Sequence, residues 1–211
     1  MIEKLKSLEP EKRERIINAA MGEFALRGYE KASTNEIVKK AGISKGLLFH
    51  YFRSKKKLFL FLFDYGIKIV ADEINGKLDR KERGLFAIIA QVTKIKMGLM
   101  SKYEKLFEFM QAAHMETSTE IRAEIEKRGI DALGANMAEL FKNTDLSGFR
   151  QGLDLEKALE IITWVTEGIV RSELNKYRLM NIKPDYNAIS LRCGEFMKLL
   201  ESLFYEGGQE K

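Results

Sequence analysis

Hydrophobic residues near the start of the chain recur at three- and four-residue spacing, with charged residues between them. The recurring positions are Ile16, Ile17, Ala20, Phe24 and Ala25. This period draws one apolar stripe along a helix, which predicts an amphipathic helix with one buried face. Pro10 stands just before the pattern, where its missing N–H group costs nothing, and Gly28 stands where a left-handed cap can end the helix. We therefore expect a helix from about Pro10 to Gly28.

Two shorter helices are predicted after this one. Ser33 is followed three residues later by a glutamate, which is the pattern of a capping box, and Gly42 ends the short apolar stripe behind it. Ser44 can cap a third helix, in which Leu48 and Phe52 lie four residues apart and share one face. Three short helices with a glycine-bearing turn between the second and the third predict a helix-turn-helix.

The rest of the chain continues in helical periods. We expect helices over about 58–78, 85–100, 103–115, 117–142, 154–177 and 184–205. Their expected starts are marked by Ser54, by a second capping box of Thr117 and Glu120, by Asp154 and by Pro184. Residues 143–153, with two glycines, read as a loop. The pattern as a whole predicts an all-α protein of about nine helices.

Composition agrees with this class and limits the compartment. The 211 residues are 45% hydrophobic and 32% charged, as in soluble globular proteins, and contain only two prolines. The single cysteine, Cys193, cannot form an internal disulfide, which fits a reducing compartment. No apolar run approaches the roughly 18–20 residues of a membrane span, and Met1–Lys4 lacks the features of a signal peptide. We therefore expect a cytoplasmic protein that does not contact membranes.

The net charge of +5 is unevenly distributed. Residues 1–57 carry fourteen Lys or Arg against seven Glu, a net of +7, whereas the remaining residues carry a net of −2. This asymmetry favours contact between the first part of the chain and a polyanion. An ordinary solvated lysine-rich face is the alternative explanation of the same charges.

Residues 28–58 read GYEKASTNEIVKKAGISKGLLFHYFRSKKKL. The segment resembles the N-terminal DNA-binding segment of the TetR family of transcriptional regulators. The resemblance rests on Gly28-Tyr29, Ser33-Thr34, the run from Ala41 to Gly46, the aromatic end from Phe49 to Phe52, and Ser54-Lys55. It covers about residues 12–58 in detail, and beyond them only length and helix number agree. It implies a helix-turn-helix DNA-binding domain over 1–55 and a helical effector-binding and dimerisation domain over 56–211.

The resemblance also implies which residues face DNA. Those carried over are Thr34, Lys45, Gly46, Phe49, His50 and Lys55. A short helix fits the major groove, where base edges can be read, and Gly46 has no side chain to hold the backbone away from them. Lys45 can reach a phosphate or a guanine edge, and Lys55 is a plausible phosphate clamp.

Three further residues join the predicted DNA-contacting set. Ser44 opens the third helix, whose exposed N–H groups favour phosphate oxygens. Leu47 and Phe49 depart from the usual family pattern, which has a small polar residue and a tyrosine at these positions. Leu47 can touch a thymine methyl group instead, whereas Phe49 lacks a hydroxyl for phosphate. Tyr51, like His50, can donate a hydrogen bond to the DNA backbone.

The C-terminal part carries two further expectations. The helices over about 155–177 and 184–205 have wide apolar faces, and pairs of them from two subunits could form a four-helix bundle. A dimer would place two recognition helices about 34 Å apart on a palindromic operator. A pocket for a small apolar or aromatic effector is the second expectation, with core filling as the alternative for each residue. Its candidate lining is Met97, Phe107, Met110, His114 and Trp164. By family analogy, effector binding releases a repressor from its operator.

An enzyme is the main alternative class, and a helical protein-binding adaptor is another. His50, His114 and Cys193 have no metal-ligand spacing, and no phosphate loop, nucleophile elbow or dinucleotide-binding fingerprint occurs. We therefore predict no catalytic residues, no metal site and no cofactor, and a ligand-responsive repressor as the function.

Overall fold

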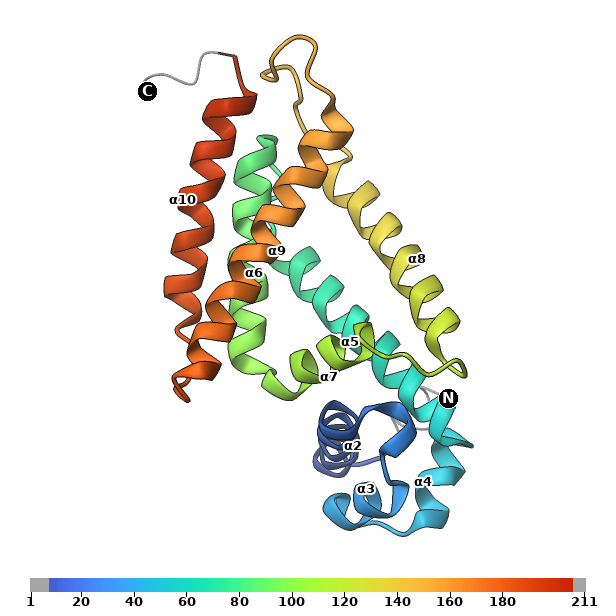
Figure 1. Ribbon diagram of the computed structural model, residues 1–211. Coiled ribbons are helices and arrows are strands. Elements are labelled where there is room, and N and C mark those ends of the chain that lie inside the picture. The colour runs from blue at the N-terminus through green and yellow to red at the C-terminus, as the bar shows by residue number, and fades with distance from the viewer. Residues whose placement is uncertain (1–7, 207–211) are drawn as a thin grey trace. The chain divides into compact units, whose positions relative to one another are not determined.

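Helices form the regular structure of the chain in the computed structural model, which describes residues 8–206 (Figure 1). In chain order the helices are α2 (Pro10–Lys31), α3 (Thr34–Ala41), α4 (Lys45–Phe52), α5 (Lys55–Lys77), α6 (Leu85–Lys102), α7 (Glu104–His114), α8 (Arg122–Phe141), α9 (Leu155–Leu179) and α10 (Tyr186–Phe204). The predicted all-α class is confirmed, and nine helices lie within the described residues. Met1–Lys4, on which the expectation about a signal peptide partly rests, lies outside them.

The chain divides into two compact units. Unit 1 comprises Met1–Asp72 and Tyr103–Met137, and unit 2 comprises Glu73–Lys102 and Ala138–Lys211. Helices α5 and α8 each continue from one unit into the other. This division differs from the predicted functional boundary near residue 55, because α7 and parts of α5 and α8 share the core of the first three helices. The functional boundary stays a prediction.

The core of unit 1 is centred on aromatic side chains from three helices. Phe24 of α2 meets Phe59 of α5 edge to face, with ring centroids 4.9 Å apart, and Phe59 meets Phe109 of α7 at 5.0 Å. Helix α2 packs against both α3 and α7. The predicted apolar stripe of α2 supplies this core, since Ile16, Ala20 and Phe24 are fully buried. The amphipathic pattern therefore produced the expected helix and the expected inner face.

Helix α3 begins and ends, and α4 begins, where the sequence predicts, although the Ser33 N–H donates to Glu23 and not to Glu36 of the predicted capping box. The Ser33 hydroxyl accepts the Glu36 N–H at 3.4 Å, and the Ser44 hydroxyl accepts the Leu47 N–H at 3.2 Å. Gly42 ends α3 with φ 65° and ψ 42°, a left-handed conformation that glycine adopts without strain. These local bonds fix both short helices, which are too short to be stable alone.

Three predicted helix ends are wrong in detail. Gly28 has φ 68° but ψ 179°, so it interrupts α2 without a left-handed cap, and helical turns continue to Lys31. The Thr117 capping box does not open α8, which begins at Arg122, because the Glu116 carboxylate binds the Thr117 N–H group itself. The last helix begins at Tyr186 and not at Pro184, and the Asp185 carboxylate caps it by accepting the N–H groups of Asn187 and Ala188.

Unit 2 is built around α10, which packs against both α6 and α9. Its core includes Phe86, Ile162 and Met197, and the ring of Tyr205 lies edge-on to Phe86 at 5.3 Å. Asp154 caps α9 as predicted, by accepting the Lys157 N–H at 3.2 Å. Among the helices of residues 8–206, none combines the length and apolar character that a membrane span requires.

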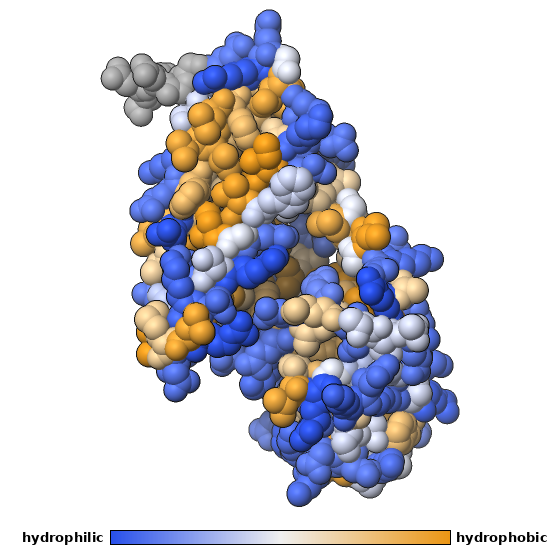
Figure 2. All heavy atoms as spheres, viewed as in Figure 1, coloured by the Kyte–Doolittle hydropathy of each residue, from blue (hydrophilic) through white to orange (hydrophobic). Residues whose placement is uncertain are grey.

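Large apolar side chains remain exposed on the two C-terminal helices. On α9 and α10 they are Ile161, Trp164, Leu179, Leu191, Phe196, Leu199 and Leu203, exposed by 37–78%. The space-filling view shows apolar side chains gathered on this part of the molecule (Figure 2). We call this set the α9–α10 apolar face.

Candidate nucleic-acid interface

Helix α4 has an inner face that anchors it and an outer face that is open to solvent. Leu48 and Phe52 are each 1% exposed and belong to the core of unit 1. Lys45, Gly46 and His50 are exposed, whereas Leu47, Phe49 and Tyr51 are half-buried. A Cβ atom added at Gly46 would meet nothing within 4 Å, so the backbone is bare on this side. The outer face can therefore approach a flat or grooved partner closely.

The charged and polar groups of this face are available. Among the described residues, no carboxylate lies within ion-pair distance of the Lys45 ammonium. His50 and Tyr51 meet edge to face, with ring centroids 5.3 Å apart. The Ser44 oxygen is occupied as an acceptor by the Leu47 N–H, but its own hydrogen can still be donated. Thr34 is half-buried and is the first residue of α3. The structure thus presents these predicted contact residues at the starts of α3 and α4 and along α4.

The Lys55 ammonium, which the sequence predicts to bind phosphate, is bonded to the protein's own backbone in the structure. Its ammonium donates to the carbonyl oxygens of Glu30 at 3.0 Å and Ala32 at 3.4 Å, and it lies 4.7 Å from the ring centroid of Tyr29. These contacts tie the start of α5 to residues 28–32, the last residues of α2 and its C-cap, which we call the turn between α2 and α3. Lys55 therefore has a structural role within unit 1, and its predicted contact with phosphate stays a prediction.

Glu23 is a buried carboxylate that the sequence analysis missed. It is 1% exposed, accepts the Ser33 N–H at 3.2 Å, and pairs with Lys40 at 3.1 Å and Arg27 at 3.3 Å. Burial raises the pKa of Glu23, but the hydrogen bond from Ser33 and the two cations outweigh it, and the net pKa is lowered. The carboxylate thereby joins α2 to both ends of α3. A single glutamate within the apolar stripe of α2 was the available signal.

The chain turns between α4 and α5 in a strained conformation. Arg53 has φ 66° and ψ −43°, and the Ser54 N–H donates to the Phe52 carbonyl at 2.7 Å. This is a γ-turn of the rare kind with positive φ, which costs about 1–3 kcal/mol for a residue other than glycine. The exposed Arg53 side chain directly follows the outer face of α4. No sequence signal distinguishes this turn from an ordinary helix end.

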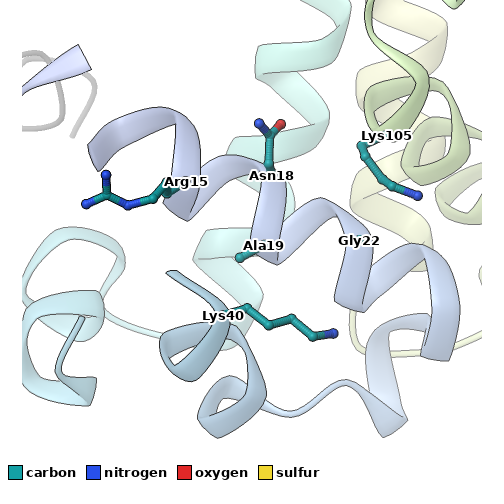
Figure 3. Close-up of a pocket in the computed structure, with 6 residues that line it drawn as sticks. All are labelled: Arg15, Asn18, Ala19, Gly22, Lys40 and Lys105. Atoms are coloured by element: carbon teal, nitrogen blue, oxygen red, sulfur yellow. The ribbon is translucent and has the colours of Figure 1, made fainter. Parts of the chain in front are cut away.

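A shallow hollow on unit 1 is lined in part by cationic side chains (Figure 3). It is lined by Arg15, Asn18, Ala19, Gly22, Lys40 and Lys105. The ammonium groups of Lys40 and Lys105 pair with Glu23 and Glu108, the latter at 2.7 Å. Two of the three cations in the lining are therefore balanced by carboxylates, and the hollow adds little to the positive field that the charge asymmetry predicts.

The predicted effector-contacting residues are distributed over both units. Phe107, Met110 and His114 belong to α7 in unit 1, where the first two pack against the core and His114 lies 5.8 Å from the Phe63 ring. Met97 is buried in unit 2 beside Ile189 and Cys193. Trp164 is 65% exposed and belongs to the α9–α10 apolar face. A pocket lined by these residues therefore stays a prediction.

Comparison with known proteins identifies the helix-turn-helix. Residues 16–62 match the family described as bacterial regulatory proteins, tetR family. This N-terminal segment is therefore similar to TetR-family regulators over those residues. It is 44% identical over 55 residues to the uncharacterized HTH-type transcriptional regulator YdgC of Bacillus subtilis, covering 26% of this chain and 28% of that protein. The matches to the first three curated relatives span 28%, 37% and 40% of their lengths.

Longer matches extend the TetR-type likeness beyond the first domain. The chain is 25% identical over 154 residues to the fatty acid metabolism regulator protein of Bacillus subtilis, covering 70% of this chain and 75% of the relative. The crystal structure of FadR from Bacillus subtilis in complex with stearoyl-CoA matches with a TM-score of 0.65 at 21% identity, over 87% of this chain and 96% of that one. The TetR-type fold, with an N-terminal helix-turn-helix followed by a helical domain, is thus confirmed. These relatives are regulators and not enzymes, in agreement with the predicted class.

Proposed function

We propose that this chain is a transcriptional regulator whose α4 enters the major groove of operator DNA. The observation that carries the proposal is the two-sided character of α4. Leu48 and Phe52 anchor its inner face in a closed core, while Lys45, the bare backbone at Gly46 and His50 face outward. An anchored helix with a thin, cationic outer face suits a groove lined by base edges and phosphates.

We assign different roles to the residues along this face. Lys45 reaches a guanine edge or a phosphate, and Leu47 packs on a thymine methyl group. Thr34, Ser44, His50 and Tyr51 donate hydrogen bonds to phosphate oxygens. Phe49 makes apolar contact with the sugar–phosphate wall. Lys55 holds the α2–α3 turn at the distance that lets these donors act together, and adds positive charge near the phosphates.

Dimerisation through α9 and α10 is part of the proposal. Monomeric proteins rarely expose a contiguous apolar patch of many large side chains, and the α9–α10 apolar face carries seven. Helices α9 and α10 already pack on each other, so a second copy of the pair would complete a four-helix bundle. The two identical helix-turn-helix units of such a dimer then favour a palindromic operator with half-sites about one helical turn of DNA apart.

We further propose that a small apolar effector releases the repressor from its operator. FadR of Bacillus subtilis, with the same fold, has been crystallised with stearoyl-CoA. A long-chain acyl-CoA is therefore the first effector to offer this chain. The candidate effector-contacting residues are Phe107, Met110 and His114 in unit 1 and, separately, Met97 and Trp164 in unit 2. Reversible action on DNA requires access to the chromosome, so we place the protein in the cytoplasm.

Fluorescence anisotropy with duplexes from the DNA flanking the protein's own gene tests the proposal. We expect tight binding to one duplex, with affinity falling steeply as salt rises because phosphate neutralisation releases counterions. Stearoyl-CoA should weaken that binding, whereas CoA without an acyl chain should not. Equal, weak binding to every duplex at low salt would contradict the proposal. The adaptor alternative predicts no DNA binding together with capture of a protein through α9–α10.

A further inference from the structure

The segment between α7 and α8 is attached to the turn between α2 and α3 through one carboxylate. Glu116 Oε2 accepts the Tyr29 N–H at 2.6 Å, across 87 positions of sequence. Its other oxygen, Oε1, accepts the N–H groups of Thr117 and Ser118, each at 3.0 Å. One side chain therefore binds three backbone donors from two separate parts of the chain.

Gly28 leaves room for this contact. Its φ of 68° lies in the region that favours glycine, and a Cβ atom at this position would lie 3.3 Å from Glu116 Oε2. That separation is tighter than an ordinary van der Waals contact, so a side chain here would press on the carboxylate. The conformation of Gly28 thus turns the Tyr29 N–H toward Glu116 and keeps the path open.

Further contacts hold the same turn. The Tyr29 side chain is 3% exposed, stacks against Phe24 and meets Phe59 edge to face. Burial raises the pKa of Tyr29, and its hydrogen bond with the Glu120 carboxylate raises that pKa further. On the other side, Lys55 donates to two carbonyls of the turn. The turn is thus held by the segment 115–121 and by the start of α5.

The position of the turn in the chain makes these contacts consequential for DNA reading. The turn lies directly before Ser33, the cap of α3, and α3 contacts α4. Glu23 fixes the Ser33 N–H from α2, so the turn and the cap behave as one connected piece. A displacement of the segment 115–121 therefore acts on the start of α3 through few intervening bonds.

We propose that Glu116 is a positioning residue for DNA binding, which couples the segment between α7 and α8 to the reading helices. The inference rests on the proposed function and names the contact by which α7 and α8 set the geometry of α3 and α4. Glu116 does not touch DNA in this account. It acts by fixing the Tyr29 backbone. Loss of its carboxylate therefore lowers operator affinity and removes the coupling between the segment 115–121 and the start of α3.

Hydrogen–deuterium exchange with and without the operator duplex tests the coupling. In the natural chain, DNA should slow exchange both at Tyr29 and at Thr117–Ser118. In Glu116→Ala we expect operator affinity to fall by about tenfold, since the Tyr29 N–H loses its acceptor, and exchange at 117–118 to stop responding to DNA. Glu126→Ala is the matched control, because this glutamate pairs with Arg122 within α8 at 2.7 Å. It should keep both the affinity and the response.

Glu116→Gln separates coupling from folding. The amide keeps one acceptor for Tyr29 but presents an N–H₂ group to the Thr117 and Ser118 donors, with little change in shape. We expect a weaker response at 117–118 in a fully folded protein, judged by an unchanged circular dichroism spectrum. If Glu116→Ala does not fold, this variant decides. Natural affinity and a natural exchange response in folded Glu116→Gln would overturn the inference. Failure of the natural chain to bind any duplex would instead overturn the proposed function.

Discussion

The two units differ in how completely they bury their large apolar side chains. In unit 1, the core side chains of the first three helices are covered by α5 and α7, and the connections between helices are held by Glu23, Lys55 and Glu116. In unit 2, α9 and α10 bury one side against α6 and each other but leave residues such as Trp164 and Leu199 in solvent. Among the described residues, unit 1 is closed around its core but still exposes Leu26, Met115, Ile130 and Leu133, whereas unit 2 ends in the larger, unpartnered α9–α10 apolar face.

The difference indicates what each region contacts. A closed core leaves unit 1 free to present polar and cationic groups, and the positive charge is concentrated in its residues 1–57, which carry a net of +7, whereas its other residues carry a net of −4. Such a surface suits a polyanion, whose phosphates dominate affinity without needing apolar contact. An open apolar face suits a second protein surface, because the hydrophobic effect favours its burial. Substitutions in one region test this difference, because DNA binding is assigned to unit 1 and dimerisation to the α9–α10 apolar face.

The largest expected effect comes from placing a charge on the α9–α10 apolar face. Leu199→Glu should convert the proposed dimer to a monomer in analytical ultracentrifugation, because each subunit would have to bury a carboxylate in an apolar interface. Operator affinity should then fall about 100-fold or more, because the two helix-turn-helix units are no longer linked in one dimer and cannot bind both half-sites together. Leu146→Glu, in the loop before α9, is the control. A natural chain that sediments as a monomer would contradict this assignment.

Loss of the cation on the outer face of α4 should have the next largest effect. Lys45→Ala should weaken operator binding by roughly 1–3 kcal/mol, or about 5- to 150-fold, and flatten its salt dependence if the contact is to phosphate. Lys57→Ala removes an exposed lysine three residues beyond Ser54 and should change affinity little. Equal effects of the two variants in anisotropy titrations would show that only diffuse charge matters.

Lys55 should affect folding as well as binding. Lys55→Met keeps the aliphatic stem but removes two hydrogen bonds to carbonyls and the charge above Tyr29. We expect the free energy of unfolding to fall by about 1–2 kcal/mol in urea denaturation, with weaker binding to every duplex alike. Unchanged stability with weakened binding would instead restore the phosphate clamp as its main role.

The pH dependence of stability offers the smallest effect. The folded-state pKa of Glu23 is lowered, so its stabilising contribution is present above its unfolded pKa of about 4.3 and is lost as pH falls through the folded value. The stability difference between the natural chain and Glu23→Gln should therefore shrink as pH falls below about 4.3. Urea denaturation across that range measures it, and a constant difference would exclude Glu23 as the source.

The helices α3 and α4 were predictable from the sequence because local interactions fix them. Ser33 and Ser44 each bond an N–H group three residues ahead, and Gly42 needs only its own backbone conformation. The apolar spacing of Leu48 and Phe52 fixed the inner face of α4 and, by exclusion, its outer face. Each of these features involves residues within one helical turn, so a single sequence window contains the necessary information.

Contacts between distant segments were not predictable. Glu116 and Tyr29 are 87 positions apart, and Lys55 reaches carbonyls 25 and 23 positions earlier. The sequence pattern predicts a start of α8 at Thr117, but α8 begins at Arg122, because the same Glu116 carboxylate accepts the Thr117 N–H group that Glu120 would accept in a capping box. The exposure of Trp164 likewise depends on how α9 packs, and an amphipathic pattern cannot separate a core-facing apolar residue from an interface-facing one.

Site-specific photocrosslinking tests the contrast between the two regions most directly. A p-benzoylphenylalanine is placed at position 49 on α4 in one variant and at position 164 on α9 in another. Both proteins are then irradiated with a fluorescent operator duplex. We predict a protein–DNA adduct from position 49 and a protein–protein dimer from position 164. Crosslinks to DNA from position 164, with none from position 49, would contradict the assignment of α4 as the reading helix.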